Sequence, residues 1–396
     1  MKHSLWILLL CAATILGLSI GYRQAMGLFL TPMTTELGVG RESFAFGMGL
    51  LNLVWGVAAP FAGGIADKYG AGRVAAAGGL FYAIGLVVMM TAGSSMQMMV
   101  SGTLIGLGLS GSGFTVVLGT VGRLVAEKDR SRALGIASVG GSVGQFLALP
   151  FSHVLISGFG WVIALGVLAV TALLIVPLAA GLRSAAPAPQ GDIGQGLGEA
   201  FRDACRIPSF WLLNLGFLVC GFHLAFVAVH LPAFLADKGF EPWLATTGLT
   251  LVGLANIVGV YIFGYLGGVY SKKSVLSLLY LARALIFFLF IIIPITEVTV
   301  LVFSVAIGFL WLGTVPLTSG LVGYIFGTRY MSMLFGIVFF GHQIGAFLGS
   351  WLGGRSFDAF GSYDAIWWFC VLLGVMSAAI HMFIVEQPVK AKLAPA

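Results

Sequence analysis

The sequence has very little charge. Asp, Glu, Lys and Arg make up 9% of its 396 residues, whereas 59% of the residues are hydrophobic. Soluble domains carry about 25% charged residues, so this chain has more apolar surface than one protein core can bury. Apolar stretches such as Val162–Ala180 and Val275–Ile293 are long enough to cross a bilayer. The composition therefore excludes an ordinary soluble domain and predicts a bundle of membrane-spanning helices.

Cysteine is also scarce, and motifs of enzyme chemistry are absent from the sequence. Its four cysteines (Cys11, Cys205, Cys220 and Cys370) have neither the spacing of a disulfide framework nor that of metal ligands. The sequence contains no His-Glu-x-x-His motif and no Gly-x-x-x-x-Gly-Lys-Ser/Thr nucleotide-binding loop. We therefore expect no metal, no cofactor, no ATP-driven step, no enzymatic activity and no nucleic-acid partner.

Hydropathy predicts twelve spans joined by short connections. They are residues 4–31, 43–66, 74–92, 96–122, 132–156, 161–182, 209–235, 243–269, 274–293, 298–326, 331–354 and 363–385. The one long polar connection, residues 183–208, divides the chain into an N-terminal six-helix bundle (1–182) and a C-terminal six-helix bundle (209–396). All fourteen acidic residues fall in loops or at the ends of spans.

The distribution of Lys and Arg predicts the orientation in the membrane, because these residues accumulate on the cytoplasmic side. With a cytoplasmic N-terminus, the cytoplasmic segments hold Lys2, Lys68, Arg73, Arg123, Lys128, Arg130, Arg132, Arg183, Arg202, Arg206, Lys272, Lys273, Arg329, Lys390 and Lys392. The opposite side holds only Arg41, Lys238 and Arg355. We expect a multi-pass, monomeric protein of the inner (plasma) membrane with both termini in the cytoplasm.

The two halves of the sequence repeat one another. Residues 63–70 match residues 264–271 at an offset of 201, and five landmarks (Gly135, Gly140, Gly144, Phe146 and Phe159) recur at the same offset. Near the first span the offset is 200, which aligns Tyr22-Arg23 and Pro32 with Phe222-His223 and Pro232. Such a repeat predicts two pseudo-symmetric six-helix bundles.

The stretch Gly63-Gly64-Ile65-Ala66-Asp67-Lys68-Tyr69-Gly70 resembles the Gly-x-x-x-Asp-Arg/Lys-x-Gly loop of the major facilitator superfamily. It lies between spans two and three, as it does in that family, and its degenerate copy lies between spans eight and nine. The segments 22–33 and 335–345 are further similar to bacterial monocarboxylate and oxalate/formate transporters. Those carriers bind the carboxylate through an arginine of span eight, whereas Asn256 and Val260 stand at the matching places here.

Two arginines are predicted inside the membrane, although no acidic residue is predicted there. A buried cation without an anionic partner is costly, so the partner is expected to be the cargo. The resemblance puts the first of them, Arg23, on a span that lines the central cavity, with Tyr22 and Gln24 beside it. We predict that Arg23 holds the carboxylate of the substrate. The alternative is that its side chain reaches to the outer interface.

His223 is the repeat equivalent of Arg23 on span seven. Because histidine titrates near neutrality, it is our candidate for the proton-coupling group; the alternative is a neutral, hydrogen-bonded packing residue. Arg283, with Tyr280 one turn before it, lies near the middle of span nine and either contacts the substrate or binds neighbouring carbonyl groups. His342 and Gln343 of span eleven offer polar lining or helix-packing hydrogen bonds.

By resemblance, Asp67, Lys68, Arg73 and Arg123 form a cytoplasmic gate that holds the two halves together; the alternative is a solvated loop whose charges only set the topology. The sequence as a whole predicts a secondary transporter of small organic anions, most simply monocarboxylates. It works by alternating access, with proton symport as the coupling. Exchange of one carboxylate for another and export of drugs or metabolites are the alternatives.

Overall fold

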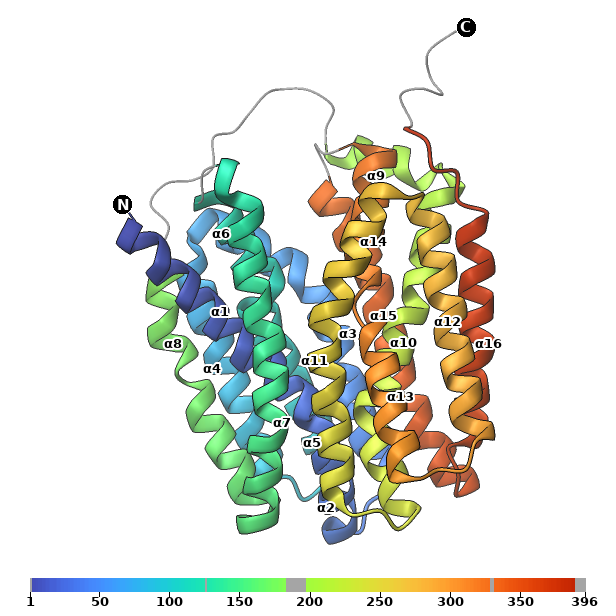
Figure 1. Cartoon of the computed structure of the whole chain (residues 1–396). Coiled ribbons are helices and arrows are strands. Elements are labelled where there is room, and N and C mark those ends of the chain that lie inside the picture. Colours follow the sequence, from blue (N-terminus) through green and yellow to red (C-terminus); the bar gives the residue numbers. More distant parts are fainter. Residues whose placement is uncertain (1, 125–126, 183–196, 328–330, 389–396) are drawn as a thin grey trace, which may run out of the picture.

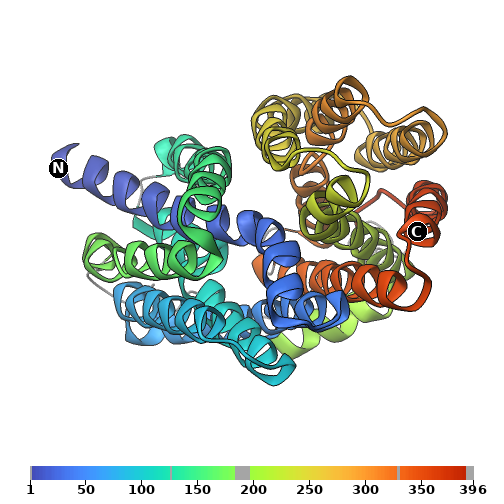
Figure 2. The same cartoon turned by 90° about the horizontal axis from the view of Figure 1, so that it is seen from below.

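The computed structural model describes residues 2–124, 127–182, 197–327 and 331–388 of the chain. Side chains are described at these positions except at 2–4, 67, 122–123, 127–132, 134–135, 197–200 and 331–332. The described backbone is helical throughout, apart from short turns. Figure 1 shows the helices running side by side through the molecule, and Figure 2, at right angles, shows them gathered into two groups.

The first group contains α1 (Lys2–Ala25), η1 (Met26–Phe29), α2 (Leu30–Leu37), α3 (Arg41–Tyr69), α4 (Ala71–Met90), α5 (Ser95–Ser112), α6 (Phe114–Leu124), α7 (Glu127–Ala172), α8 (Ile175–Leu178) and η2 (Ala179–Leu182). The second contains α10 (Pro208–Asp237), α11 (Pro242–Val269), α12 (Lys272–Ile292), α13 (Glu297–Phe309), α14 (Thr314–Phe326), α15 (Met331–Phe360) and α16 (Asp364–Met382). The short α9 (Leu197–Cys205) precedes α10.

Eleven segments of the described chain are long and apolar enough to cross a membrane. The longest, Ile136–Leu182, has 47 residues and contains two passes, because the chain reverses at Gly160. Gly160 has a φ of 81°, a backbone conformation that residues with a side chain rarely adopt. Counting this segment twice gives the twelve spans expected from the sequence, in an all-α membrane protein.

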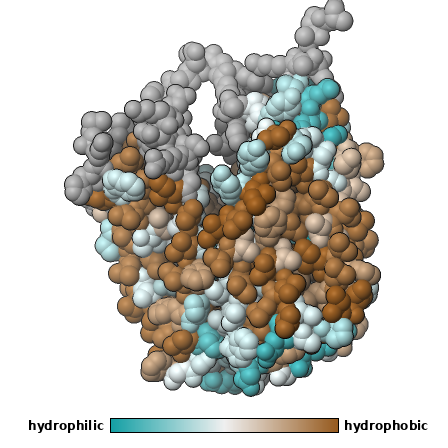
Figure 3. Space-filling view, viewed as in Figure 1, coloured by the Kyte–Doolittle hydropathy of each residue, from teal (hydrophilic) through white to brown (hydrophobic). Residues whose placement is uncertain are grey.

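Lipid-facing surface covers the middle of the molecule. In Figure 3 apolar residues dominate the central band of this face, and hydrophilic residues gather at its lower end. Helix α11 illustrates the pattern, because Leu254, Val258, Tyr261 and Tyr265 share one side of the helix and are all highly exposed. Such a stripe is stable only in contact with hydrocarbon.

Glycines allow equivalent helix pairs to pack closely in both halves. Gly144 of α7 lies against the backbone of Gly17 on α1, and Gly345 of α15 lies against the backbone of Leu218 on α10. A side chain at either glycine would collide with that backbone. Gly144 and Gly345 are related by the offset of 201 residues, so the sequence repeat corresponds to a repeated helix contact.

Four predicted spans are interrupted. Span one continues past residue 31 to Leu37, with the 3-10 segment η1 between α1 and α2. Span six breaks at the turn residues 173–174, between α7 and α8. Span four breaks at Gly113, which is extended (φ −89°, ψ −167°), and span ten breaks between Phe309 and Thr314. Interruptions at membrane depth require other groups to bind the freed backbone atoms.

Candidate functional site

A small cavity lies where the two halves meet. It is lined by Arg23, Met26, Met48, Leu51, Asn52, Ala225, Ala228 and Val229, which come from α1, η1, α3 and α10. Its volume is about 20 Å³, enough for one water molecule. The halves are therefore closed around this point, and a larger ligand requires them to separate. Arg23 is the only charged residue in the described part of the lining.

Arg23 lies in the last turn of α1, immediately before the 3-10 segment η1. Its guanidinium carbon is 5.4 Å from the centre of the Trp55 ring. Its Nε and Nη2 both donate to Oδ1 of Asn52, at 3.0 and 2.6 Å. Since a neutral amide leaves the positive charge uncompensated, the side chain retains a need for an anion.

The sequence alone does not single out Asn52. An amide within an apolar span is usually a helix-packing group, and only its position facing Arg23 distinguishes it. The neighbours that the sequence did single out, Tyr22 and Gln24, do not line the cavity. Tyr22 donates from its hydroxyl to Oγ1 of Thr171 at 2.7 Å, within the N-terminal half. Gln24 is buried, and its Nε2 has no partner among the described residues.

His223 lies on the other side of α10 from the cavity. Successive helical residues are turned by about 100°, so Ala225, Ala228 and Val229 share one face and His223 lies roughly opposite to them. Nε2 of His223 is 2.9 Å from the carbonyl oxygen of Cys370 on α16. The structure thus brings Arg23 to the cavity but does not bring His223 there.

Arg283 is fully buried within the C-terminal half, at the interruption of span ten. Its Nη2 donates to the carbonyl oxygens of Leu310 and Trp311, while Nε and Nη1 have no partner among the described residues. Oδ1 of Asn256 accepts from the backbone N–H of Leu312 at 3.0 Å. Arg283 and Asn256 thus both stabilise this helix break. Asn256 is the residue that stands where related carriers are expected to have a binding residue. Arg283 is not part of the cavity lining.

His342 and Gln343 lie on α15, between the cavity and the interior of the C-terminal half. Nδ1 of His342 is 3.1 Å from Oε1 of Gln343. The His342 ring stacks on Phe339, with ring centres 5.6 Å apart, and Phe339 in turn contacts Trp55 at 5.5 Å. A continuous row of rings therefore joins His342 to the ring that lies beside Arg23.

Polar contacts between the halves gather at the end of the molecule opposite to the termini. Arg41 pairs with both carboxylate oxygens of Asp237 at 2.6 Å and donates to the hydroxyl oxygen of Tyr363 at 3.0 Å. The carboxylate of Asp358 accepts from the backbone N–H groups of Arg41 and Glu42, at 3.0 and 2.8 Å, and so caps α3.

Glu42 extends these contacts by accepting from Trp351 at 2.8 Å and from Arg355 at 3.3 Å. Among the described residues, every hydrogen bond between the halves belongs to this group of Arg41, Glu42, Asp237, Trp351, Arg355, Asp358 and Tyr363, the far-end cluster. The sequence placed a gate only at the other end.

Half of the predicted gate at that other end lies outside the described residues, because the side chains of Asp67 and Arg123 are not among them. Lys68 is exposed and lies over the ring of Tyr69, 5.1 Å from its centre. Arg73 is exposed at the start of α4. The gate therefore stays a prediction.

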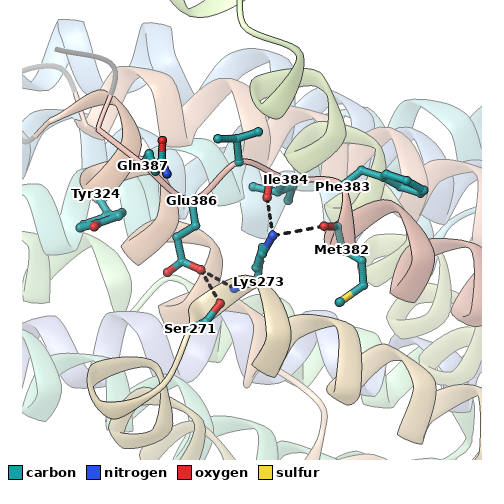
Figure 4. Close-up of a pocket in the computed structure, with 9 residues that line it drawn as sticks. Ser271, Lys273, Tyr324, Met382, Phe383, Ile384, Glu386 and Gln387 are labelled. Atoms are coloured by element: carbon teal, nitrogen blue, oxygen red, sulfur yellow. Dashed lines mark hydrogen bonds between the residues drawn. The ribbon is translucent and has the colours of Figure 1, made fainter. Parts of the chain in front are cut away.

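A larger pocket of about 610 Å³ opens at the surface, at the end of α16. Figure 4 shows Glu386 reaching the start of α12, where its carboxylate accepts from Ser271 and from the backbone N–H groups of Lys272 and Lys273. Nζ of Lys273 donates to the carbonyl oxygens of Met382 and Ile384. The polar groups of this pocket already bind one another and hold the segment after α16 against the start of α12. The pocket lies apart from the interface of the halves.

Comparison with known proteins places this geometry in a family. The profile of the Major Facilitator Superfamily matches residues 5–350, and the chain belongs to that superfamily of membrane transporters. The fold is similar to that of a bacterial homologue of the human lysosomal transporter Spinster in an inward-facing and occupied conformation. The TM-score is 0.76 at 16% identity, over 98% of each chain.

Among relatives in sequence, monocarboxylate transporter 13 of Rattus norvegicus is 27% identical over 369 residues, which cover 91% of this chain and 84% of that protein. The uncharacterized MFS-type transporter YhjX of Escherichia coli is 25% identical over 87% of this chain and 86% of that protein. The predicted family, helical fold and non-enzymatic class are therefore confirmed.

Proposed function

We propose that this secondary transporter moves small organic anions, namely monocarboxylates, and that Arg23 binds their carboxylate between the two halves. The observation that carries the proposal is the position of Arg23: among the described residues it is the single charged residue that lines the cavity, and no described acidic residue compensates it there. A guanidinium binds a carboxylate through two parallel hydrogen bonds, so the chemistry of the site suits this class of anion.

The rest of the cavity supports an anion with one charge and an apolar remainder. Met26, Met48, Leu51 and Val229 present only apolar side chains, which would leave a second carboxylate without a partner. The names of several relatives, such as monocarboxylate transporter 13, agree with this class.

We further propose that the anion crosses the plasma (inner) membrane together with a proton, with both chain termini in the cytoplasm. Symport of a proton neutralises the charge of a monocarboxylate in a membrane interior where the sequence predicts no acidic side chain. We place the proton on His342 in preference to His223, because His342 lies close to the surroundings of Arg23, whereas His223 contacts the carbonyl oxygen of Cys370 on the other side of α10.

Uptake into proteoliposomes tests this function. Purified protein should accumulate labelled acetate, pyruvate or benzoate beyond the passive level of protein-free liposomes when the inside is alkaline, and Arg23→Ala should abolish this excess. Accumulation that requires carboxylate on the opposite side, and not a pH difference, would assign exchange in place of symport. Full uptake by a folded Arg23→Ala protein would overturn the site.

A further inference from the structure

We infer that Asn52 is a positioning residue, which orients the guanidinium of Arg23 so that its Nη1–Nη2 edge receives the carboxylate. The inference rests on the proposed function of Arg23 and assigns Asn52, a residue of α3, a part in the same site. Both residues line the cavity between the halves.

Two of the nitrogen donors of Arg23, Nε and Nη2, already donate to Asn52. A guanidinium offers two edges that can each hold a carboxylate, one formed by Nε and Nη2 and one by Nη1 and Nη2. A single oxygen of Asn52 accepts from both members of the first edge. Nη1 has no hydrogen-bond partner among the described residues, so the second edge stays available for a ligand.

The side-chain amide of Asn52 is held in one orientation. Nδ2 of Asn52 donates to the carbonyl oxygen of Met48, one helical turn earlier, at 2.9 Å. Rotating the amide by half a turn would direct its N–H groups at the guanidinium and lose all of these contacts. Asn52 is also buried (3% exposed), so few other groups can replace the lost bonds.

The positive charge of Arg23 is not neutralised by its partner Asn52. Asn52 orients the cation without neutralising it, whereas an Asp or Glu at the same place would pair with Arg23 and compete with the substrate. The ring of Trp55 lies on another side of the guanidinium, 5.4 Å from its carbon, and further restricts its motion. The result is an oriented, uncompensated cation.

The inference differs from the simpler view that Asn52 only fills an edge of Arg23 until the substrate displaces it. A placeholder competes with the ligand, so its removal would tighten binding. A positioning group limits the motion of a flexible side chain before the ligand arrives, so its removal weakens binding. The two views therefore predict opposite effects of Asn52→Ala.

The test uses the purified full-length chain, with the tightest-binding of acetate, pyruvate and benzoate as the probe. Asn52→Ala should weaken binding by roughly 10- to 100-fold, the range for a lost hydrogen bond to a charged group. Asn214→Ala is the matched control, because Asn214 also donates its Nδ2 to a carbonyl one turn earlier, that of Phe210, at 2.9 Å, and should leave binding unchanged.

Asn52→Asp supplies a readout that a purely structural role would not give. The variant keeps the shape of the side chain but places a carboxylate beside Arg23, so binding should be lost at neutral pH. Wild-type binding by a folded Asn52→Asp protein would mean that the charge at this position does not act on Arg23. This variant also decides the case if Asn52→Ala does not fold, as judged by its thermal midpoint and its elution in gel filtration.

The same comparison in an Arg23→Lys background shows whether Asn52 acts through Arg23. Lysine has no Nε–Nη2 edge, so Asn52→Ala should cost much less there. Unchanged or tighter binding by Asn52→Ala, equal losses in both backgrounds, or wild-type binding by Asn52→Asp would each overturn the inference. Wild-type binding by Arg23→Ala would instead overturn the proposed site itself.

Discussion

Arg41 and Asp237 join the two halves of the transporter through two hydrogen bonds of 2.6 Å. The pair lies at the end of the molecule opposite to the termini and includes the first residue of α3 and the last residue of α10. Because the cavity at Arg23 is closed in this conformation, opening it toward that end requires the pair to separate.

Asp237→Asn should therefore favour the conformation that is open at the far end. The side chains of Arg41 and Asp237 are 13% and 31% exposed, so water screens the pair in part, and the shift should be on the order of 1 kcal/mol. Labelling of single cysteines placed beside the cavity, with a membrane-impermeant reagent, measures it. Arg355→Gln is the control, since its partnership with Glu42 is longer and more exposed and should matter less.

Arg23→Ala should lose most of the binding of a small carboxylate. Removing one partner of a charge-assisted, bidentate contact costs on the order of 2–5 kcal/mol. Arg23→Lys keeps the charge but not the planar fork, so it should bind more weakly than the wild type and more tightly than Arg23→Ala. Titration calorimetry of the three proteins gives the order, and equal affinities would contradict it.

Arg283→Ala should destabilise the protein by roughly 1.5–3 kcal/mol, the range for a lost hydrogen bond to a charged group. The carbonyl groups of Leu310 and Trp311 would be left without this partner inside the membrane. If Arg283 acts only on the helix break, the remaining folded protein should bind substrate with unchanged affinity. A loss of affinity without a loss of thermal stability would restore Arg283 as a ligand, which is its other predicted role.

His342→Gln should abolish accumulation driven by a pH difference while it preserves exchange of labelled for unlabelled anion. Glutamine keeps the hydrogen-bonding capacity of the ring but does not titrate. His223→Gln serves as the comparison, because its ring contacts the carbonyl oxygen of Cys370 and lies away from the cavity. Loss of pH-driven uptake in His223→Gln alone would return the coupling role to that residue.

The sequence predicts the number and approximate limits of the spans, because hydrocarbon selects long apolar segments whatever their neighbours are. It does not predict the breaks at η1, Gly113 and residues 310–313, because these depend on groups elsewhere in the chain, such as Arg283 and Asn256, that bind the freed backbone. Apolarity alone is compatible with a continuous helix at each place.

For the site, the sequence predicts the cation but not its surroundings. An intramembrane Arg23 is visible because it is costly, whereas the role of Asn52 depends on which way two helices face. His223 illustrates the same difficulty. An offset of 200 aligns Arg23 with His223, while an offset of 201 aligns it with Leu224, and one residue turns a helix by about 100°. With the offset of 201, the repeat equivalent of Arg23 is Leu224, whose immediate neighbour Ala225 does line the cavity.

The seam between α3 and α15 has a consequence for turnover. Along it the halves meet through rings, such as Phe46 with Phe347 and Trp55 with Phe339, whose contacts are weakly directional compared with hydrogen bonds. Separating the halves along this seam breaks no hydrogen bond between them among the described residues, because those bonds belong to the far-end cluster. We therefore expect substitutions in the far-end cluster to change the rate of transport more than conservative ones along the seam.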